Sequence, residues 1–208
     1  YLFVISAKRK EALKDLAQKY INFLSKTKHS LADICYSTLT RRSLLDKKLV
    51  IIVNSKDELA SSLANYLKDN NDKNIVANDE KPNSRKKIAF IFSGQGSQWY
   101  GMGRQLLQKS KVYCDIISEI DKIFFNIAGY SLLDEILQPK SKSNIEKTKV
   151  AQPLIMALQI GLFEMYKSFG VLPKAALGHS IGEVAAAYCA GVIDLQQAVE
   201  VIYYRSKE

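Results

Sequence analysis

The chain has 208 residues, of which 47% are apolar and 25% charged, and it carries a net charge of +9. This apolar fraction can form a sizeable core and excludes disorder of the whole chain, and the length suits one domain plus a smaller neighbour. No apolar run approaches the ~20 residues of a membrane span, and no signal peptide opens the chain, so we expect no membrane contact.

The cysteines and histidines argue against metal and disulfide chemistry. None of the three cysteines has C-x-x-C spacing, and there are only two histidines, so we expect no zinc site and no disulfide framework. Isolated thiols fit a reducing compartment, and we therefore expect a cytoplasmic protein. Because the chain opens with Tyr1 and its last helix lacks a stop signal, we interpret it as cut from something longer, with a processed small protein as the alternative.

The positive charge is concentrated in the first part of the chain. Residues 1–87 carry a net charge of +8, whereas residues 88–208 carry a net charge of +1. The charge is spread along amphipathic segments without a recognition-helix pattern or an aromatic-and-basic sheet pattern, so we expect no nucleic-acid partner. A solvated basic face is the simplest interpretation, and contact with an acidic partner is the alternative.

The first 67 residues predict a small α/β unit. Apolar runs predict strands at residues 2–5 and 49–53, and helical periodicity predicts three helices. Each helix follows a serine that can cap it, and two of these serines begin a capping box with the acidic residue three positions later. The serines are Ser6, Ser30 (with Asp33) and Ser55 (with Glu58).

Residues 68–87 interrupt this pattern and predict a flexible linker, because Lys, Asn and Asp dominate and apolar residues are few. A second unit begins with a strand at residues 88–92, and another strand is predicted at residues 175–177. Pro153 is expected in the first turn of a long helix, where its missing N–H costs nothing. The predicted apolar face of that helix comprises Leu154, Leu158, Leu162, Met165 and Phe169. The other predicted helices cover residues 102–109, 112–127, 131–137, 183–190 and 198–204.

A nucleophile elbow is predicted at Gly178-His179-Ser180-Ile181-Gly182, a G-x-S-x-G set between a strand and a helix. The glycines remove side chains that would clash with the strand and the helix. The serine oxygen then projects at a helix N-terminus, whose free N–H groups favour developing negative charge. Chance matches to this short pattern are common, so its context carries the interpretation.

A second glycine-rich turn, Gly94-Gln95-Gly96-Ser97-Gln98, directly follows the strand at residues 88–92. A dinucleotide fingerprint would need a third glycine at position 99, which is Trp. A tight strand-to-helix turn is the structural alternative. Together with Ser180, the turn is better interpreted as a loop that offers a backbone N–H beside the serine, because acyl transfer needs two such donors.

These motifs resemble those of a known family. Residues 88–98, the Gln152-Pro153 helix start, Gly178 to Glu183 and the later Arg205 occur in an order and at intervals similar to those of malonyl transacylases. They most closely resemble the acyltransferase domains of type I polyketide synthases. Residues 1–67 resemble the small α/β linker domain between ketosynthase and acyltransferase, at Ser6-Ala7, Leu31 to Ile34 and Thr40 to Arg42.

The resemblance implies a role for each matching residue. Ser180 would be the nucleophile acylated by an acyl-CoA, and the backbone N–H groups of Gln95 and Ile181 would form the oxyanion hole. Arg205 would clamp the free carboxylate of a malonyl group, since its planar fork suits bidentate pairing, and a surface helix arginine is the alternative. His179 is expected to be a structural residue of the turn and His29 a surface residue. The family's catalytic histidine lies well downstream of the serine, outside this chain.

We therefore expect an α/β architecture: a linker domain at residues 1–67, a flexible linker at 68–87, and at 88–208 the first part of an α/β-hydrolase-like acyltransferase core. The implied reaction moves malonyl-type extender units from acyl-CoA through Ser180 to the phosphopantetheine of an acyl carrier protein, with no bound cofactor or metal. An upstream ketosynthase is the other implied partner. The open alternatives are a serine hydrolase with the same elbow, and a non-catalytic fragment or docking scaffold. The isolated chain is expected to be inactive.

Overall fold

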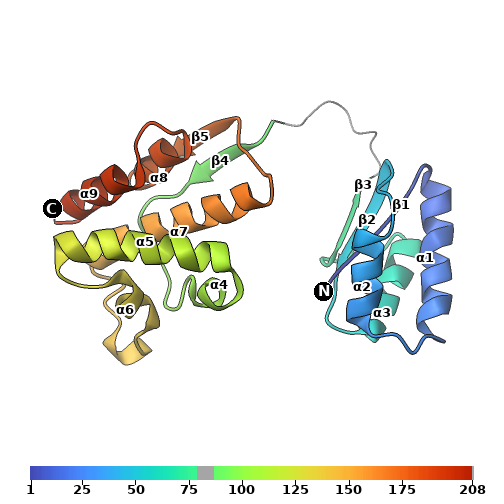
Figure 1. Ribbon diagram of the computed structural model, residues 1–208. Helices are drawn as coiled ribbons and strands as arrows, with labels where there is room; N and C mark the ends of the chain where they lie inside the picture. The colour runs from blue at the N-terminus through green and yellow to red at the C-terminus, as the bar shows by residue number, and fades with distance from the viewer. Residues whose placement is uncertain (79–86, 208) are drawn as a thin grey trace. The chain divides into compact units, whose positions relative to one another are not determined.

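The computed structural model describes residues 1–78 and 87–207, which form two compact units (Figure 1). The chain divides at Lys86 and Lys87. Both units mix helices with strands, which confirms the predicted α/β class. Residues 79–86 of the predicted linker lie outside the described residues.

A three-stranded antiparallel sheet forms the centre of the N-terminal unit, in the order β1 (Leu2–Ala7), β2 (Lys47–Ile52) and β3 (Ile75–Asn78). Helices α1 (Lys10–Leu24) and α3 (Lys56–Leu67) pack on it, and α2 (Leu31–Thr40) lies against β1. Alternate strand residues meet the apolar faces of α1 and α3, so the core is continuous across the sheet and the helices. Its fully buried members are Phe3, Leu13, Ala17, Leu49, Ile51, Val53, Leu59 and Leu63.

The start of α1 differs from the prediction. Ser6 does not cap the helix, because β1 continues through Ala7 and includes it. Its hydroxyl accepts a hydrogen bond from the Leu45 N–H at 2.9 Å and donates one to the Ser43 carbonyl at 3.2 Å. Ser6 therefore ties the strand to the loop before β2. Arg9 is the N-cap residue of α1, and its side chain forms no capping hydrogen bond.

The other two predicted caps are present in different degrees. The Ser30–Asp33 capping box is confirmed, with both reciprocal hydrogen bonds formed. Ser55 caps α3 by accepting a hydrogen bond from the Glu58 N–H at 3.1 Å. However, the Glu58 carboxylate accepts from the N–H of Asn54 at 2.7 Å, so the predicted capping box of α3 is only half formed.

The prediction that residues 68–87 form only a linker is wrong for Ile75–Asn78. These residues form β3, in register with β2 through the pairs Val50–Val76 and Ile51–Ile75. Asp72, which lies just before β3, accepts hydrogen bonds from the Asn74 N–H at 3.0 Å and from the Ser62 hydroxyl of α3 at 3.0 Å. The polar residues of this stretch thus tie the chain to α3 and lead it back to the sheet.

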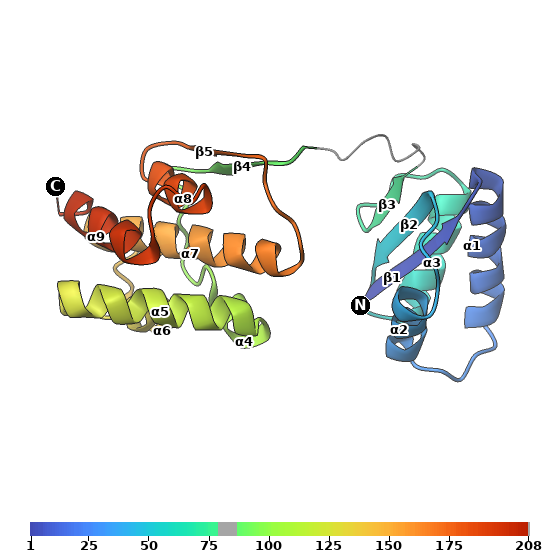
Figure 2. The ribbon, with the colours of Figure 1, turned by 45° about the horizontal axis from the view of Figure 1, so that its top comes forward.

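The C-terminal unit has a parallel pair of strands, β4 (Ala89–Phe92) and β5 (Ala175–Gly178), with Phe92 paired to Gly178. The long α7 (Thr148–Ser168) lies between this sheet and α5 (Lys111–Ala128), and α8 (Gly182–Cys189) follows β5 along the same side of the sheet (Figure 2). The remaining elements are α4 (Arg104–Lys109), α6 (Leu132–Leu137), a 3-10 turn (Lys140–Lys142) and α9 (Leu195–Arg205).

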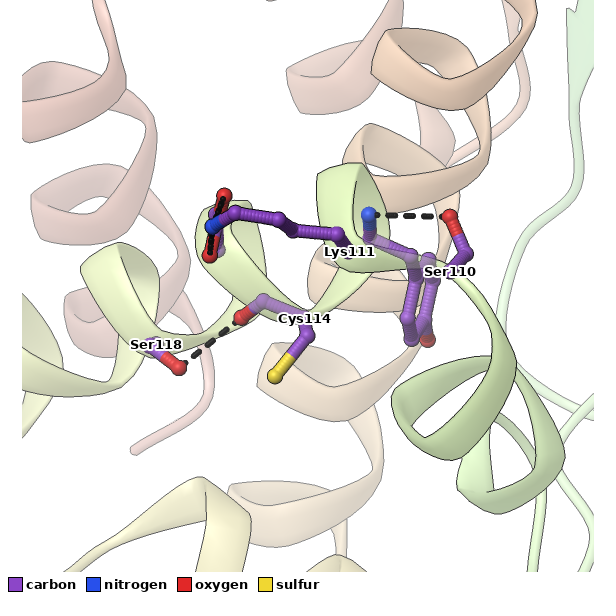
Figure 3. A network of polar contacts seen from close by, with 6 residues as sticks. Ser110, Lys111, Cys114 and Ser118 are labelled. Carbon is purple, nitrogen blue, oxygen red and sulfur yellow. Dashed lines mark hydrogen bonds and ion pairs between the residues drawn. The ribbon is translucent and has the colours of Figure 1, made fainter.

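Helix α5 begins with a side-chain cap followed by polar contacts along its outer face (Figure 3). Ser110 accepts a hydrogen bond from the Tyr113 N–H at 3.2 Å, and Lys111 pairs with Asp115 at 2.7 Å. Ser118 donates to the Cys114 carbonyl at 2.8 Å. Since the Lys111–Asp115 pair is exposed to solvent, it contributes little to stability, and the helix is fixed mainly by its buried face.

Pro153 does not lie in the first turn of α7, because the helix begins five residues earlier, at Thr148. A proline at this position cannot donate to the carbonyl four residues before it, which belongs to Lys149. The hydroxyl of Tyr130 donates to that carbonyl at 2.7 Å instead. A side chain from another part of the unit thus satisfies the acceptor that the proline leaves free.

The predicted apolar face of α7 is only partly buried. Leu154 is buried, but Leu158 and Leu162 line a groove of about 480 Å³ that α7 shares with β4, and Phe169 is 70% exposed. The buried surface of α7 is wider than a single stripe, because both the sheet side and the α5 side cover it. Its buried residues are Val150, Ala151, Pro153, Leu154, Ile155, Met156, Ala157, Gln159, Ile160, Gly161 and Phe163.

The outer face of the β4–β5 sheet is apolar and exposed. Ile91 and Leu177 are cross-strand partners, with exposed fractions of 75% and 63%. Phe90 and Phe92 point to the opposite face, where the Phe90 ring contacts Phe163 at a centroid distance of 6.1 Å. The helices of this unit therefore bury one face of the sheet.

Candidate active site

Ser180 lies in a sharp turn between β5 and α8, as the elbow motif predicts. Its φ of 56° is in the left-handed region, which a non-glycine residue adopts only when its surroundings impose it. Two glycines make the turn possible. A Cβ on Gly178 would lie 2.4 Å from the N and Cα of Glu183, and one on Gly182 would lie 2.3 Å from the carbonyl oxygen of Phe92.

The elbow is held by backbone hydrogen bonds to β4 and within the turn. The His179 N–H donates to the Phe92 carbonyl at 3.0 Å, and the Glu183 N–H donates to the Ser180 carbonyl at 3.0 Å. The Ile181 side chain is fully buried, and its N–H has no hydrogen-bond partner among the described residues. A free N–H beside Ser180, at the start of α8, is available to a developing oxyanion.

The glycine-rich turn after β4 lies against this elbow. Gly94 is buried, and a Cβ built on it would lie 3.4 Å from the Cβ of Ser180 and 2.8 Å from Nδ1 of His179. The turn that contains Gln95 is therefore next to the serine, although residue 94 and residue 180 are far apart in the sequence. Within the described part of the chain, the Gln95 N–H also has no hydrogen-bond partner.

The Gln95 side chain is directed to the start of α7. Its Oε1 accepts a hydrogen bond from Gln152 Nε2 at 3.1 Å, and its Nε2 lies 3.5 Å from the Thr148 hydroxyl. The sequence resemblance includes Thr148 and Gln152 in a stretch similar to that of malonyl-type domains, but it does not predict their contacts with Gln95. These contacts tie the Gln95 turn to a helix that is well packed in the core.

Arg205 reaches Ser180 from the last turn of α9. Its Nη2 donates to the Ser180 Oγ at 3.1 Å, and its side chain is exposed. Asp194 and Gln197 form a capping box at the start of α9, a signal that the motif analysis missed, and Ala198, Val199 and Ile202 bury its inner face. The capping box thus fixes the start of α9, and the last turn of the helix places the Arg205 guanidinium next to Ser180.

His179 does not share a hydrogen bond with Ser180 in the described part of the C-terminal unit, where Arg205 is the hydrogen-bond partner of the Ser180 hydroxyl. His179 is exposed next to the nucleophile position, and its Nδ1 lies toward Gly94. His29 is exposed in the N-terminal unit. His179 therefore does not form a Ser–His pair with its neighbour Ser180.

The cysteines are poor competitors for the nucleophile role. All three are free, and burial raises the pKa of the Cys35 and Cys189 thiols, which disfavours their reactive thiolates. Burial, followed by the nearby Glu164, raises the pKa of Tyr188, whose hydroxyl donates to Glu164 at 3.0 Å.

Across residues 1–78 and 87–207, no group of three His, Cys, Asp or Glu could hold a metal ion. In the same residues, no helix is long and apolar enough to cross a membrane.

The comparisons identify the class of protein. Residues 89–208 match the family model of the acyl transferase domain, and residues 1–63 match a model described as CurL-like, PKS C-terminal. The chain belongs to the acyl transferase domain family and resembles the ketosynthase–acyltransferase linker followed by the N-terminal part of that domain in polyketide synthases.

Its relatives are large polyketide synthases. The highly reducing polyketide synthase sdnO of Sordaria araneosa is 37% identical over 212 residues, covering 98% of this chain and 7% of the relative. Polyketide synthase GfsB of Streptomyces halstedii is 35% identical over 209 residues, covering 98% of this chain and 4% of the relative. The chain thus spans only a small part of these proteins.

Solved acyltransferase domains share the fold. The domain of ZmaA has a TM-score of 0.88 at 24% identity, with 99% of this chain and 48% of that chain covered. The domain from module 8 of the salinomycin polyketide synthase has a TM-score of 0.84 at 27% identity, with 99% and 49% covered. The present chain therefore corresponds to about half of each solved chain.

Proposed function

We propose that this chain is part of an acyltransferase that transfers malonyl units from malonyl-CoA to the phosphopantetheine thiol of an acyl carrier protein. The observation that carries the proposal is the Arg205 Nη2–Ser180 Oγ distance of 3.1 Å. A cation next to the nucleophile suits an acyl group that ends in a carboxylate. An upstream ketosynthase is the expected neighbour, since the relatives are polyketide synthases.

In the first half-reaction, Ser180 Oγ attacks the thioester carbonyl of malonyl-CoA while its proton passes to a general base. The family resemblance assigns that base to a histidine beyond this chain. The carbonyl oxygen becomes an oxyanion that the N–H groups of Gln95 and Ile181 stabilise. The intermediate then expels the CoA thiolate, which takes up a proton, and leaves a malonyl ester on Ser180.

In the second half-reaction, the carrier-protein thiol attacks the Ser180 ester. The thiol proton passes to the base, the same two N–H groups stabilise the second oxyanion, and Ser180 leaves with a proton. Throughout, Arg205 pairs with the free malonyl carboxylate. No bound cofactor takes part in this scheme.

A serine hydrolase would use the same elbow and is the second candidate. Water would then replace the carrier thiol as the acceptor in the second half-reaction. The position of Arg205 favours the malonyl transferase, because a carboxylate clamp suits a malonyl donor. A non-catalytic scaffold is the third candidate. Residues 1–208 alone are expected to lack turnover because His179 does not pair with Ser180 and the family resemblance assigns the base to a different histidine.

The direct test is labelling with radioactive malonyl-CoA in an intact acyltransferase that contains residues 1–208. We expect label on a peptide containing Ser180, no label in Ser180→Ala, and faster transfer to a carrier-protein thiol than to water. Equal labelling of Ser180→Ala would refute the assignment of the nucleophile. Water as the preferred acceptor would favour the hydrolase, and absence of label in both proteins would favour the scaffold.

A further inference from the structure

Two serine hydroxyls form a short hydrogen-bond chain within the Gln95 turn. Ser93 Oγ donates to Ser97 Oγ at 3.1 Å, and Ser97 Oγ donates to the Gly94 carbonyl oxygen at 3.2 Å. The chain therefore ends on the peptide group that joins Gly94 to Gln95. The N–H of that same peptide group is the oxyanion donor in the function proposed above.

A peptide group is planar, so fixing its carbonyl also fixes its N–H. The bond between Gly94 and Gln95 is trans, since the chain has no cis peptide bond among the described residues. The Gln95 N–H consequently points away from the Gly94 oxygen that Ser97 holds. Hydrogen bonds in series polarise one another, so donation from Ser97 to this carbonyl also strengthens the N–H at the other end as a donor.

A buried side chain of α7 anchors the start of this hydrogen-bond chain. Gln159 is 8% exposed, and its Nε2 donates to the Ser93 carbonyl at 2.8 Å. Its Oε1 is buried and, in the described structure, has no hydrogen-bond partner. An apolar side chain at this position would avoid the free-energy cost of burying an unpaired amide oxygen. The hydrogen bond from Gln159 Nε2 to the Ser93 carbonyl is therefore a specific reason for a glutamine at this position.

We propose that Ser97 is a positioning residue for acyl transfer. Its hydroxyl holds the Gly94 carbonyl so that the Gln95 N–H faces the oxyanion formed at Ser180. This role rests on the proposed function, because it requires the Gln95 N–H to be an oxyanion donor. Ser97 acts through the peptide group and touches neither the acyl group nor the nucleophile.

The test compares Ser97→Ala and Ser97→Thr in an intact acyltransferase that contains this chain. We measure the rate of Ser180 acylation in a single turnover over a range of malonyl-CoA concentrations. In Ser97→Ala we expect the maximal rate to fall about 10-fold, less than the ~10²–10³ that follows loss of a donor, with an unchanged half-saturating concentration. Ser97→Thr keeps the hydroxyl and is expected to restore the rate to within about threefold.

The infrared carbonyl band of the malonyl ester on Ser180 gives a second readout. Weaker donation to this carbonyl shifts its stretching band to higher frequency, so we expect that shift in Ser97→Ala but not in Ser97→Thr. Ser168→Ala is the matched control, because Ser168 Oγ also donates to the carbonyl three residues before it, that of Met165, at 2.7 Å. It should leave both the rate and the band unchanged.

An unchanged rate and band in Ser97→Ala, or an equal loss in Ser97→Thr, would overturn the positioning role while leaving the proposed function intact. The proposed function has its own arm in the same assay. If Ser180→Ala still takes up the malonyl group, the nucleophile assignment fails, and the role of Ser97 fails with it.

Discussion

The Nη2 atom of Arg205 lies 3.1 Å from the Oγ of Ser180, although the two residues are 25 positions apart in the sequence. Ser180 lies in the turn just before α8, and Arg205 is the last residue of α9, so the packing of these two helices sets the distance between the two side chains. The contact places a fixed positive charge beside the hydroxyl. It is the basis of the first prediction.

Replacing Arg205 by Ala is expected to lower kcat/KM for malonyl-CoA by about 10- to 100-fold, because a hydrogen bond to a charged group is worth about 1.5–3 kcal/mol. Arg205→Lys should recover only part of this loss, since an ammonium lacks the planar fork. Activity with acetyl-CoA, which has no free carboxylate, should fall less. Lys207→Ala is the control, and a uniform loss for both donors would contradict the clamp.

Malonyl-CoA is expected to be preferred over methylmalonyl-CoA. In the resembling family, a branched apolar residue after the nucleophile accompanies malonyl use, and that residue is the fully buried Ile181 here. One methyl group changes the free energy of transition-state binding in a pocket by only ~1–3 kcal/mol. Both CoA esters should therefore react, at different rates. Competition between the two CoA esters measures the ratio, and a methylmalonyl preference would reverse the prediction.

Adding a methyl group to either elbow glycine is expected to destabilise the C-terminal unit by about 3 kcal/mol or more, the upper range for overpacking. In Gly178→Ala and Gly182→Ala the new Cβ would meet backbone atoms at 2.4 and 2.3 Å, and backbone cannot move aside as a side chain can. Gly191 has a φ of +72° but open space around it, so Gly191→Ala should cost only about 1–2 kcal/mol. Urea unfolding followed by Trp99 fluorescence gives these values. Equal losses in all three variants would argue against the steric explanation.

The Tyr130–Lys149 hydrogen bond is expected to matter because Pro153 is present. Tyr130→Phe keeps the ring contact with Phe124 but leaves the Lys149 carbonyl without a donor, which should cost about 0.5–1.5 kcal/mol. In a Pro153→Ala background the new N–H can donate to that carbonyl, so the same change should cost less. A double-mutant cycle measures the difference, and strictly additive effects would contradict the link.

The N-terminal unit is expected to lose stability in acid through Asp72. The pKa of Asp72 lies below its ordinary value of 3.8, first because of the Asn74 N–H and then because of the Asn65 and Ser62 side chains. Since the folded pKa is depressed, this stabilisation is complete above the unfolded pKa and is lost as the pH falls through the folded pKa.

Hydrogen exchange of β2 and β3 amides between pH 3 and 7, corrected for intrinsic rates, measures this loss. Asp72→Asn should exchange faster at pH 7 and should depend less on pH in the acid range. Asp15→Asn, at an exposed position on α1, is the control. Identical pH dependence of wild type and Asp72→Asn would show that another group dominates.

The sequence predicts the elements of this fold better than their ends. Strong local signals, such as the Ser30–Asp33 box and the glycines around Ser180, are confirmed because they are set by neighbours in the chain. β3 was missed because Ile75–Asn78 is short, and its pairing with β2 is a contact between distant segments. The start of α7 was misplaced for a similar reason, since Tyr130 supplies the donor that Pro153 lacks.

The candidate site shows the same division. The motif order identifies Gln95, Ser180 and Arg205, and the geometry brings the Gln95 turn and Arg205 to the serine. Their catalytic roles remain predictions. The contacts of Ser97 and Gln159 carry no local pattern, because they depend on how the turn packs on α7, and only the three-dimensional structure reveals them.

The left-handed backbone at position 180 restricts which side chain can occupy it. A β-branched residue is a genuine outlier at such a φ, so threonine, although an alcohol, cannot replace serine here without distorting the turn. Cysteine is unbranched at Cβ and fits the same backbone. The elbow therefore admits a primary alcohol or a thiol and rejects a secondary alcohol, a selection made by backbone geometry before any chemistry begins.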